Sequence, residues 1–425
     1  MALYNVIIGA VNQIYGMKII PNSKRRHYMA IVGIFLIATV LIVEMVGCGN
    51  APTKHFLMII PTEDGEVSEP GEGNFIYDKG TVVNLIAEAN DGCYFVNWGG
   101  NVTTIANVEA ATTTITMNDN YIIYAIFGLE IRDWYGLDEI RDNLYGSHTL
   151  MNDLDSTTPG YEELASQTAN QGKGWQPIGT WYLSAFTGSF DGQGHEIRDL
   201  FINRPNENPV GLFGFTGEEG VVKDINMVDV TVTGYYHVGG LVGFNNGIVT
   251  NSYSTGNVYG TVGMVGGLVG KNSGTVGNSY STASVSGIVN AGGLVGDNWH
   301  GTVSNSYSTG SVIGSSCVGG LVAYSNNGTV TNSYSTGSVT GNEEVGGLVG
   351  RNYDGTVGDS FWDTETSGQY TSHGGTGKTT DEMRGFATFL GAGWNIYTVA
   401  PGSTNSTCTW NIVNGVTYPF LSWQT

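Results

Sequence analysis

The stretch Val238-Gly-Gly-Leu-Val-Gly-Phe-Asn245 decides the fold, because it returns at 265–272, 291–298, 318–325 and 345–352. A Val-x-Asn-Ser-Tyr-Ser element follows each of the first four copies. The aromatic residues of this second element are 27 residues apart, at Tyr253, Tyr280, Tyr307, Tyr334 and Phe361. A fixed period of this length is typical of repeat proteins whose units stack on one another.

Each unit holds short β-branched runs separated by Gly, Asn and Ser, which are turn residues. Such a unit has no helical period and cannot bury a core alone, whereas stacked units can. A propeller blade needs about 40 residues, so a 27-residue unit is too short for a propeller. The sequence therefore predicts an all-β protein: a parallel β-solenoid (β-helix) of 27-residue coils with short capping helices, preceded by a small β-rich module.

Stacking would place equivalent residues above one another about 4.8 Å apart. One inward column should hold Val249, Val276, Val303, Val330 and Val357. A polar column, with side chains hydrogen-bonded along the axis, should hold Asn251, Asn278, Asn305, Asn332 and Asp359. We expect serine and threonine columns beside the tyrosines to face solvent.

Both ends of the solenoid need caps, because a bare terminal coil is an open edge. Leu137, Ile140 and Leu144 have helical spacing, which predicts an N-terminal cap within 134–145. Thr379-Thr-Asp-Glu382 reads as a capping box that opens an amphipathic helix with Met383, Phe386 and Leu390 on one face. The predicted parts are 1–48 (export segment), 49–128 (β-rich module), 129–235 (cap and irregular first coils), 236–362 (repeats) and 363–425 (C-terminal cap).

Composition excludes several classes of protein. The 425 residues include 65 Gly, with 16 basic against 37 acidic residues and a formal net charge of −21. This balance argues against a nucleic-acid partner, since phosphates need a basic face. The 40% share of hydrophobic residues argues against a disordered chain.

The amino terminus predicts export. Lys24, Arg25 and Arg26 precede an apolar run, Met29 to Val43, and Gly47-Cys48 then resembles a bacterial lipobox. We expect lipidation of Cys48; the alternative is a retained membrane helix from Met29 to Val46. Either reading anchors the chain at the cell surface through the membrane.

The other cysteines are Cys93, Cys317 and Cys408. They have no zinc-site spacing, and we expect neither a metal site nor a cofactor. We expect small buried thiols rather than a structural disulfide, with a Cys93–Cys408 pairing left open.

The Gly-Gly-Leu-Val-Gly units with Asn-Ser-Tyr-Ser-Thr-Gly resemble GLUG-motif repeats, over roughly Trp134–Thr425. That resemblance implies a role at the surface of bacteria or archaea and implies no reaction. Segments Gly65–Gly71, Tyr77–Ala87 and Tyr94–Trp98 are similar to divergent internalin-type B repeats, which implies a stalk or spacer module. Alternation in Val82–Ala87 and Thr112–Met117 supports strands there independently.

Catalytic groups are scarce in the repeats. Between Thr231 and Gly341 the only charged side chains are Lys271 and Asp297, with His237 and His300 as the histidines. No general acid–base pair can be built from these, so we expect a non-catalytic protein. A polysaccharide-acting alternative would have to use Asp191 with Glu196 in the entry segment.

The tyrosine column Tyr253, Tyr280, Tyr307 and Tyr334 is the candidate binding site. Facing outward, it would be a flat aromatic stripe suited to sugar rings or a surface protein; facing inward, it would be an aromatic core. Phe361 in the last position favours burial, because its ring needs no hydroxyl partner. The predicted function is adhesion to an extracellular glycan or surface protein, with a spacer lacking a ligand as the alternative.

Overall fold

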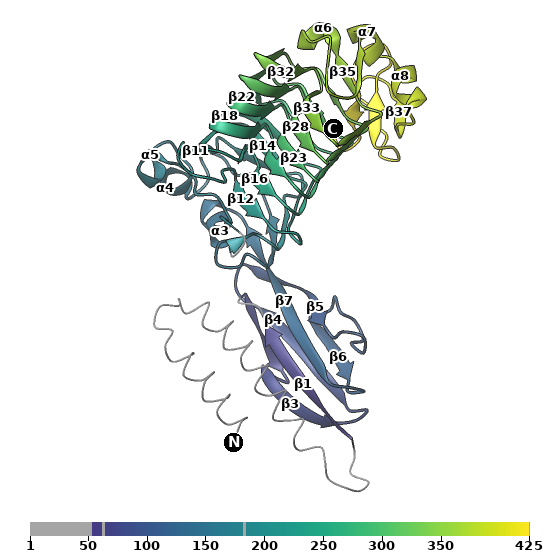
Figure 1. Cartoon of the computed structure of the whole chain (residues 1–425). Coiled ribbons are helices and arrows are strands. Elements are labelled where there is room, and N and C mark those ends of the chain that lie inside the picture. The colour runs from purple at the N-terminus through teal and green to yellow at the C-terminus, as the bar shows by residue number, and fades with distance from the viewer. Residues whose placement is uncertain (1–52, 62–63, 182–183, 425) are drawn as a thin grey trace, which may run out of the picture. The chain divides into compact units, whose positions relative to one another are not determined.

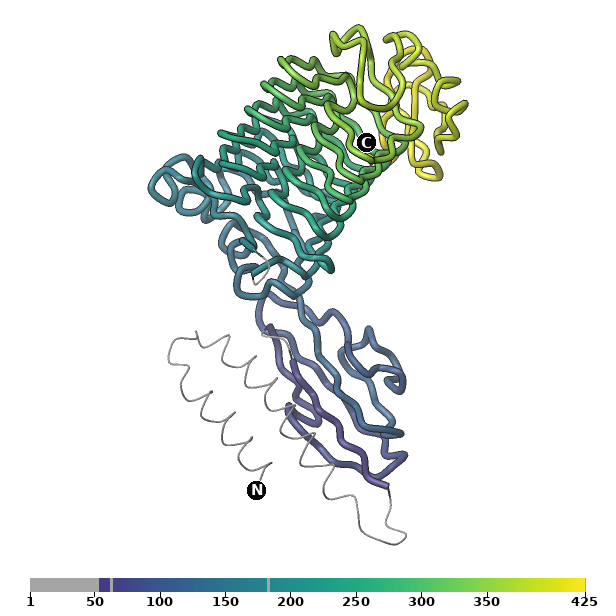
Figure 2. Tube along the Cα trace, in the orientation of Figure 1, coloured from purple at the N-terminus to yellow at the C-terminus, as the bar shows by residue number. Residues whose placement is uncertain are grey.

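The computed structural model describes residues 53–61, 64–181 and 184–424 (Figures 1 and 2). The chain divides into two compact units, Met1–His55 and Phe56–Thr425, and the description below concerns the second. Cys48 and the apolar run before it lie outside the described residues. In the described part of the chain, no helix is long and apolar enough to cross a membrane.

A small β-rich module comes first, as predicted. One sheet has the order β3-β1-β7 with β5 against β7, and a second has the order β2-β4-β6. Leu57, Leu85, Ile115 and Phe127 are fully buried in the core of this module. The two strands predicted from alternation are confirmed as β4 and β6. The strands are β1 (Lys54–Pro61), β2 (Gly65–Glu69), β3 (Gly73–Asp78), β4 (Val82–Ala89), β5 (Cys93–Gly100), β6 (Thr112–Thr116) and β7 (Tyr121–Ile131).

Strand β7 continues from this module into the repeats. Its last residues, Gly128–Ile131, pair in parallel with β8 (Ser147–Leu150). The sheet then runs on through one face of the solenoid. The predicted boundary at residue 128 thus falls inside a strand, and backbone hydrogen bonds join the parts on either side.

The repeats form a parallel β-solenoid of about six coils with a repeat of roughly 27 residues, which confirms the predicted fold (Figure 2). One face is the row β8, β9 (Ser189–Asp191), β13 (Val221–Lys223), β17 (Ile248–Thr250), β20 (Thr275–Gly277), β24 (Thr302–Ser304), β29 (Thr329–Thr331) and β34 (Thr356–Gly358). A second face is the six-stranded sheet β12 (Phe213–Thr216), β16 (Val242–Asn245), β19 (Val269–Asn272), β23 (Val295–Trp299), β28 (Val322–Asn326) and β33 (Val349–Tyr353). The third face includes β14 (Asn226–Gly234), β18 (Tyr253–Gly266), β22 (Ser284–Gly292), β26 (Val312–Ile313) and β31 (Val339–Thr340).

The predicted valine column is confirmed. Val249, Val276, Val303 and Val330 are fully buried and lie in register on successive strands, with a partly buried Val357 at the end. Burial of such side chains is worth about 1.5–3 kcal/mol each. Every coil adds the same apolar layer, so each coil is stabilised by its neighbours.

The predicted asparagine column has an axial hydrogen bond at its first member, where Asn251 Nδ2 donates to Asp224 Oδ1 at 3.0 Å, and it also has a role in the backbone. Asn251, Asn278, Asn305, Asn332 and Asp359 have φ between 47° and 49°, in the left-handed region. Asn and Asp tolerate this conformation better than other side chains. These residues therefore turn the chain at a corner.

An amide ladder forms instead at the last residue of the Gly-Gly-Leu-Val-Gly-x-Asn segment. Asn245 Nδ2 donates to Asn272 Oδ1 at 2.8 Å, and Asn272 Nδ2 donates to Asn298 Oδ1 at 2.9 Å. All three side chains are fully buried. The ladder thus satisfies polar groups inside the solenoid while linking one coil to the next.

Glycine is required in the repeated Gly-Gly pair because the backbones of neighbouring coils approach each other closely there. A Cβ on Gly293 would lie 2.1 Å from the Gly320 carbonyl oxygen and 2.2 Å from Ser308 Oγ.

The serine column was predicted to face solvent, but its four side chains are fully buried: Ser254, Ser281, Ser308 and Ser335. The side chains turn inward, and two of the hydroxyls donate to backbone carbonyls: Ser254 Oγ to Gly267 O and Ser335 Oγ to Gly347 O, both at 2.6 Å.

The caps are present at both ends. Helix α3 (Trp134–Glu139) buries Trp134 and Leu137 at the start of the solenoid. At the other end, the capping box predicted at Thr379 is confirmed in α7 (Thr380–Met383).

The single amphipathic helix predicted after this box is wrong. The chain breaks at Gly385 and restarts as α8 (Phe386–Gly391). Phe389 is buried and Leu390 is 53% exposed, because the break rotates the second helix. A three-stranded sheet completes this C-terminal segment: β37 (Ile396–Thr398), β38 (Trp410–Ile412) and β39 (Phe420–Leu421). The thiols of Cys93, Cys317 and Cys408 are free, and only Cys317 is fully buried.

Replacing Asn272 by Ala should lower the free energy of unfolding by about 1–3 kcal/mol, since it removes the acceptor of Asn245 Nδ2 and takes the donor from the buried Asn298 Oδ1. Urea denaturation followed by circular dichroism measures this loss. Thr282→Ala, at an exposed position of the same coil, is the control. Equal stability of the two variants would contradict a stabilising ladder.

Candidate binding surfaces

The tyrosine column forms a continuous ring stack. Successive centroids of Tyr253, Tyr280, Tyr307 and Tyr334 are 4.7, 4.7 and 4.9 Å apart, with interplanar angles of 12°, 2° and 4°. Strand pairing sets this spacing, because equivalent residues lie one strand apart. The rings lie outside the main apolar core of the coils, in a separate cluster.

The C-terminal segment covers much of this stack. Trp410 contacts Tyr307 and Tyr334, with ring centroids 6.1 and 5.9 Å apart, and Trp423 lies 5.7 Å from Tyr280. Tyr334 is 1% exposed and Tyr307 7%, whereas Tyr253 and Tyr280 are half-buried. The open aromatic stripe considered from the sequence is therefore not present, because a segment remote in sequence packs on it.

Hydrogen bonds fix the segment to the tyrosines. The Tyr334 hydroxyl donates to Pro419 O at 2.6 Å, and Gln424 Nε2 donates to the Tyr307 hydroxyl at 2.7 Å. Burial raises the pKa of Tyr307 and of Tyr334 above the ordinary tyrosine value. Both hydroxyls thus stay neutral and serve as fixed polar contacts.

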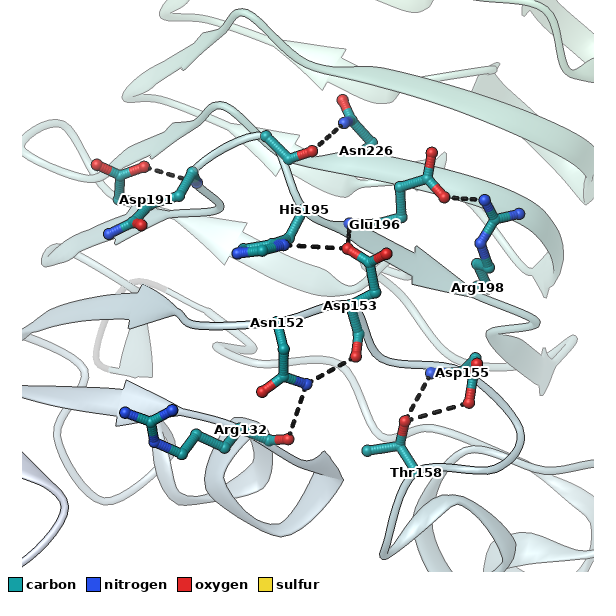
Figure 3. Close-up of polar contacts among 12 residues, drawn as sticks. Arg132, Asn152, Asp153, Asp155, Thr158, Asp191, His195, Glu196, Arg198 and Asn226 are labelled. Carbon is teal, nitrogen blue, oxygen red and sulfur yellow. Dashed lines mark hydrogen bonds and ion pairs between the residues drawn. The ribbon is translucent and has the colours of Figure 1, made fainter.

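The acidic entry segment is a network of structural contacts (Figure 3). Asp153 Oδ1 lies 3.1 Å from His195 Nδ1 and accepts the Glu196 backbone N–H at 3.0 Å. These contacts hold the turn after β9 against the loop that follows β8.

The two carboxylates considered for catalysis also have partners. Asp191 pairs with Lys223 at 2.6 Å and accepts the Gln193 backbone N–H at 2.9 Å. Glu196 pairs with Arg198 and accepts the Tyr253 hydroxyl at 3.3 Å. Asp191 and Glu196 lie on β9 and β10 (Glu196–Arg198), which belong to different sheets. Both carboxylates therefore have partners that stabilise the fold.

An aromatic patch lies on the outer face of the six-stranded sheet. Trp299, Asn326 and Tyr353 occupy one register position on β23, β28 and β33. Trp299 is 40% exposed and Tyr353 52%. Beside them the Arg351 guanidinium lies 5.7 Å from the Tyr324 ring centroid, and Asn326 Nδ2 donates to the Tyr324 hydroxyl at 3.2 Å. We call Trp299, Tyr324, Asn326, Arg351 and Tyr353 the aromatic patch.

The sequence analysis missed this patch, although a signal was there. The position before the last residue of each repeated segment varies, while its neighbours are Gly and Asn in every copy except the fourth, which has Ala323 and Ser325. In register, it holds Phe244, Lys271, Asp297, Tyr324 and Arg351. When one position of a strict repeat varies, the stacking of the coils does not require a particular side chain at that position.

His237 lies near this varying column. Its side chain is buried, its Nδ1 has no hydrogen-bond partner in the described part of the chain, and its ring lies 5.2 Å from that of Phe244. Burial, helped by the charge of Lys271, lowers the pKa of His237 to about 4. The imidazole is therefore neutral at physiological pH.

Comparisons with known proteins agree with the two-part architecture. Residues 56–130 match the family model of a divergent InlB B-repeat domain, and residues 234–259 and 314–340 match the GLUG motif. The chain thus contains a divergent InlB B-repeat domain followed by GLUG repeats.

Two curated relatives share part of the chain. Halomucin of Haloquadratum walsbyi is 30% identical over 220 residues, which is 48% of this chain and 2% of halomucin. A "Putative Gly-rich membrane protein" of Evansella cellulosilytica is 37% identical over 123 residues, 27% of this chain and 13% of that protein. The chain therefore spans only a small part of the length of either relative.

A solved structure shares the fold. The crystal structure titled as a "putative immunoglobulin A1 protease" from Bacteroides ovatus has a TM-score of 0.50 and 19% identity, and covers 71% of this chain and 93% of its own. At this identity the likeness concerns the fold alone.

Tyr334→Phe should weaken attachment of the C-terminal segment by about 1 kcal/mol, since it removes the hydroxyl that donates to Pro419. Limited proteolysis of residues 379–424 measures local opening. Tyr353→Phe, at an exposed ring, is the control. Cleavage at the wild-type rate in Tyr334→Phe would show that the bond does not hold the segment.

His237→Gln should reduce the decrease in the free energy of unfolding that accompanies acidification. The folded histidine resists protonation down to about pH 4 while the unfolded one is protonated below its usual pKa of 6.5, so the wild-type chain loses stability as pH falls from 6.5 to 4. One pKa unit corresponds to about 1.4 kcal/mol, so the loss is at most ~3 kcal/mol. Urea midpoints at pH 7 and pH 4.5 measure it, with Lys271→Arg in both chains so that they differ only at residue 237 and the pKa of Asp297, raised by burial, contributes equally to each. Identical pH slopes would contradict a neutral buried His237.

Proposed function

We propose that this chain is an exported, surface-anchored, non-catalytic binding protein whose solenoid contacts glycans through the aromatic patch. The observation that carries the proposal is the patch itself, where exposed Trp299 and Tyr353 flank an amide and a guanidinium. Sugar rings present an apolar face and hydroxyl edges, which suit aromatic faces and planar polar groups respectively.

Charge supports the same location. Between Asp224 and Gly377 the only basic side chains are Lys271 and Arg351, and both lie in the varying column of the six-stranded sheet. The Arg351 guanidinium, which pairs with Glu344 at 3.2 Å, is the cationic group that this face offers to an acidic or neutral sugar.

The relatives support a surface role. One is named halomucin and the other a Gly-rich membrane protein. Export through the segment ending at Cys48, with a lipid or helical anchor, is part of the proposal and would place the solenoid outside the cell.

A spacer without a specific ligand is the second candidate. Strand β7 joins the N-terminal module to the solenoid through continuous backbone pairing. Such a connection transmits force and limits bending, as a stalk requires.

A glycan-array assay on residues 49–425 tests the proposal. We expect saturable binding that Trp299→Ala and Tyr353→Ala each weaken about tenfold or more, a change of ~1.4 kcal/mol or more. Tyr259→Ala, at a ring 44% exposed on β18, is the matched control on another face. A blank array from folded protein would favour the spacer, and equal loss in the control would place the site elsewhere.

A further inference from the structure

Lys271 and Asp297 form a registered pair in an otherwise uncharged region. They are the only Lys, Arg, Asp or Glu residues between Thr231 and Gly341. Strands β19 and β23 pair in parallel and place the two residues directly opposite each other. Equivalent Cα atoms on such strands are about 4.8 Å apart and present their side chains on the same side. The lysine chain is therefore long enough to reach the carboxyl group.

Asp297 is buried without a partner. Its side chain is fully buried, and in the described part of the chain neither carboxylate oxygen accepts a hydrogen bond. Leaving an ionised carboxylate in this state costs several kcal/mol. Burial raises the pKa of Asp297 to about 6, against the opposing effect of the Lys271 charge. The group thus carries its proton part of the time near neutral pH.

The Lys271 amine lies in an aromatic environment. Its Nζ is 5.0 Å from the ring centroid of Phe244 and 5.0 Å from that of Trp299. Trp299 follows Asp297 by two residues on the same strand, so the amine and the carboxyl share one side of the sheet. Two aromatic rings thus flank the amine on the side of the sheet that carries Asp297.

A proton acceptor is close by. His237 contacts the same Phe244 ring, with centroids 5.2 Å apart, and its Nδ1 has no hydrogen-bond partner in the described part of the chain. A neutral imidazole can relay a proton transiently between an attacking nitrogen and a departing oxygen.

We propose that Lys271 and Asp297 condense into an intramolecular amide bond that joins two successive coils of the solenoid. The Lys271 ammonium first passes a proton to the Asp297 carboxylate, and the free amine attacks Cγ of the resulting carboxylic acid. The new Nζ–Cγ bond forms as one C–O bond breaks. The departing hydroxyl takes one proton from the attacking nitrogen, relayed by His237, and leaves as water. The reaction needs no oxidant, metal or cofactor.

Formation of the amide bond removes the charges of both Lys271 and Asp297. A neutral amide replaces an unpartnered carboxylate and an ammonium, so the cost of burying charge disappears. It also ties one coil to the next independently of strand pairing, which suits a protein that bears load at a surface.

Peptide mapping of the denatured full chain tests the proposal. Trypsin acts after Lys223, Lys271 and Arg351 but not after an acylated lysine. We expect an uncut peptide 224–351 in place of 224–271 and 272–351. Chymotrypsin acts after Tyr259, Tyr280 and Trp299, and we expect 260–280 and 281–299 to remain joined, with the mass of their sum less one water.

Two variants and one internal pair are the controls. Lys271→Arg keeps the charge without a competent nucleophile, and Asp297→Ala removes the acceptor, so each should release both tryptic peptides. Lys223 and Asp191 lie 2.6 Å apart in a solvent-accessible pair and should stay unlinked, with normal cleavage after Lys223. His237→Gln should lower the linked fraction several-fold while circular dichroism remains unchanged.

The proposal fails if folded wild-type protein yields 260–280 and 281–299 as separate, full-mass peptides, which would leave a non-covalent pair. It fails equally if one water is lost from 281–299 alone, which would indicate a cyclic imide at Asp297. The test uses no glycan, so its outcome is independent of the proposed binding function.

Discussion

Parallel pairing of each strand with its equivalent in the next coil is the constraint on which the rest of the structure depends. It repeats every side chain at the strand spacing, so any residue type repeated every 27 positions becomes a column. Apolar residues give the valine column and the buried leucines, and asparagine gives an amide ladder from Asn245 to Asn298. Tyrosine gives a ring stack. The same pairing that builds the core therefore also fixes what lies on each face.

This constraint explains why glycine is so frequent. The Gly-Gly pairs stand where neighbouring coils come too close for a side chain, as Gly293 shows against Gly320. The left-handed corner at Asn251, Asn278, Asn305, Asn332 and Asp359 is taken, by contrast, by Asn and Asp, whose short polar side chains tolerate that backbone. Two different requirements thus produce the two most conspicuous residue types of the repeat.

The C-terminal segment determines the role of the tyrosine column, because it covers the rings. A column that faces away from the coil interior would be a binding surface in an uncapped solenoid. Here Trp410, Trp423 and the carbonyl of Pro419 cover it, so that the rings anchor the cap. The exposed aromatic surface lies instead on the six-stranded sheet, where Trp299 and Tyr353 repeat only at alternate coils.

By itself the sequence determined the period, the parallel β-solenoid, the valine column, the N-terminal module and the capping box at Thr379. These features follow from local composition and spacing, which stacking repeats unchanged. Only the tertiary structure decided that the serines turn inward, that the helix breaks at Gly385 and that the C-terminal segment covers Tyr307 and Tyr334. It alone placed His237 against the Phe244 ring that the Lys271 amine also faces. These outcomes depend on side-chain packing between coils and against the C-terminal segment, which the spacing of residue types does not specify.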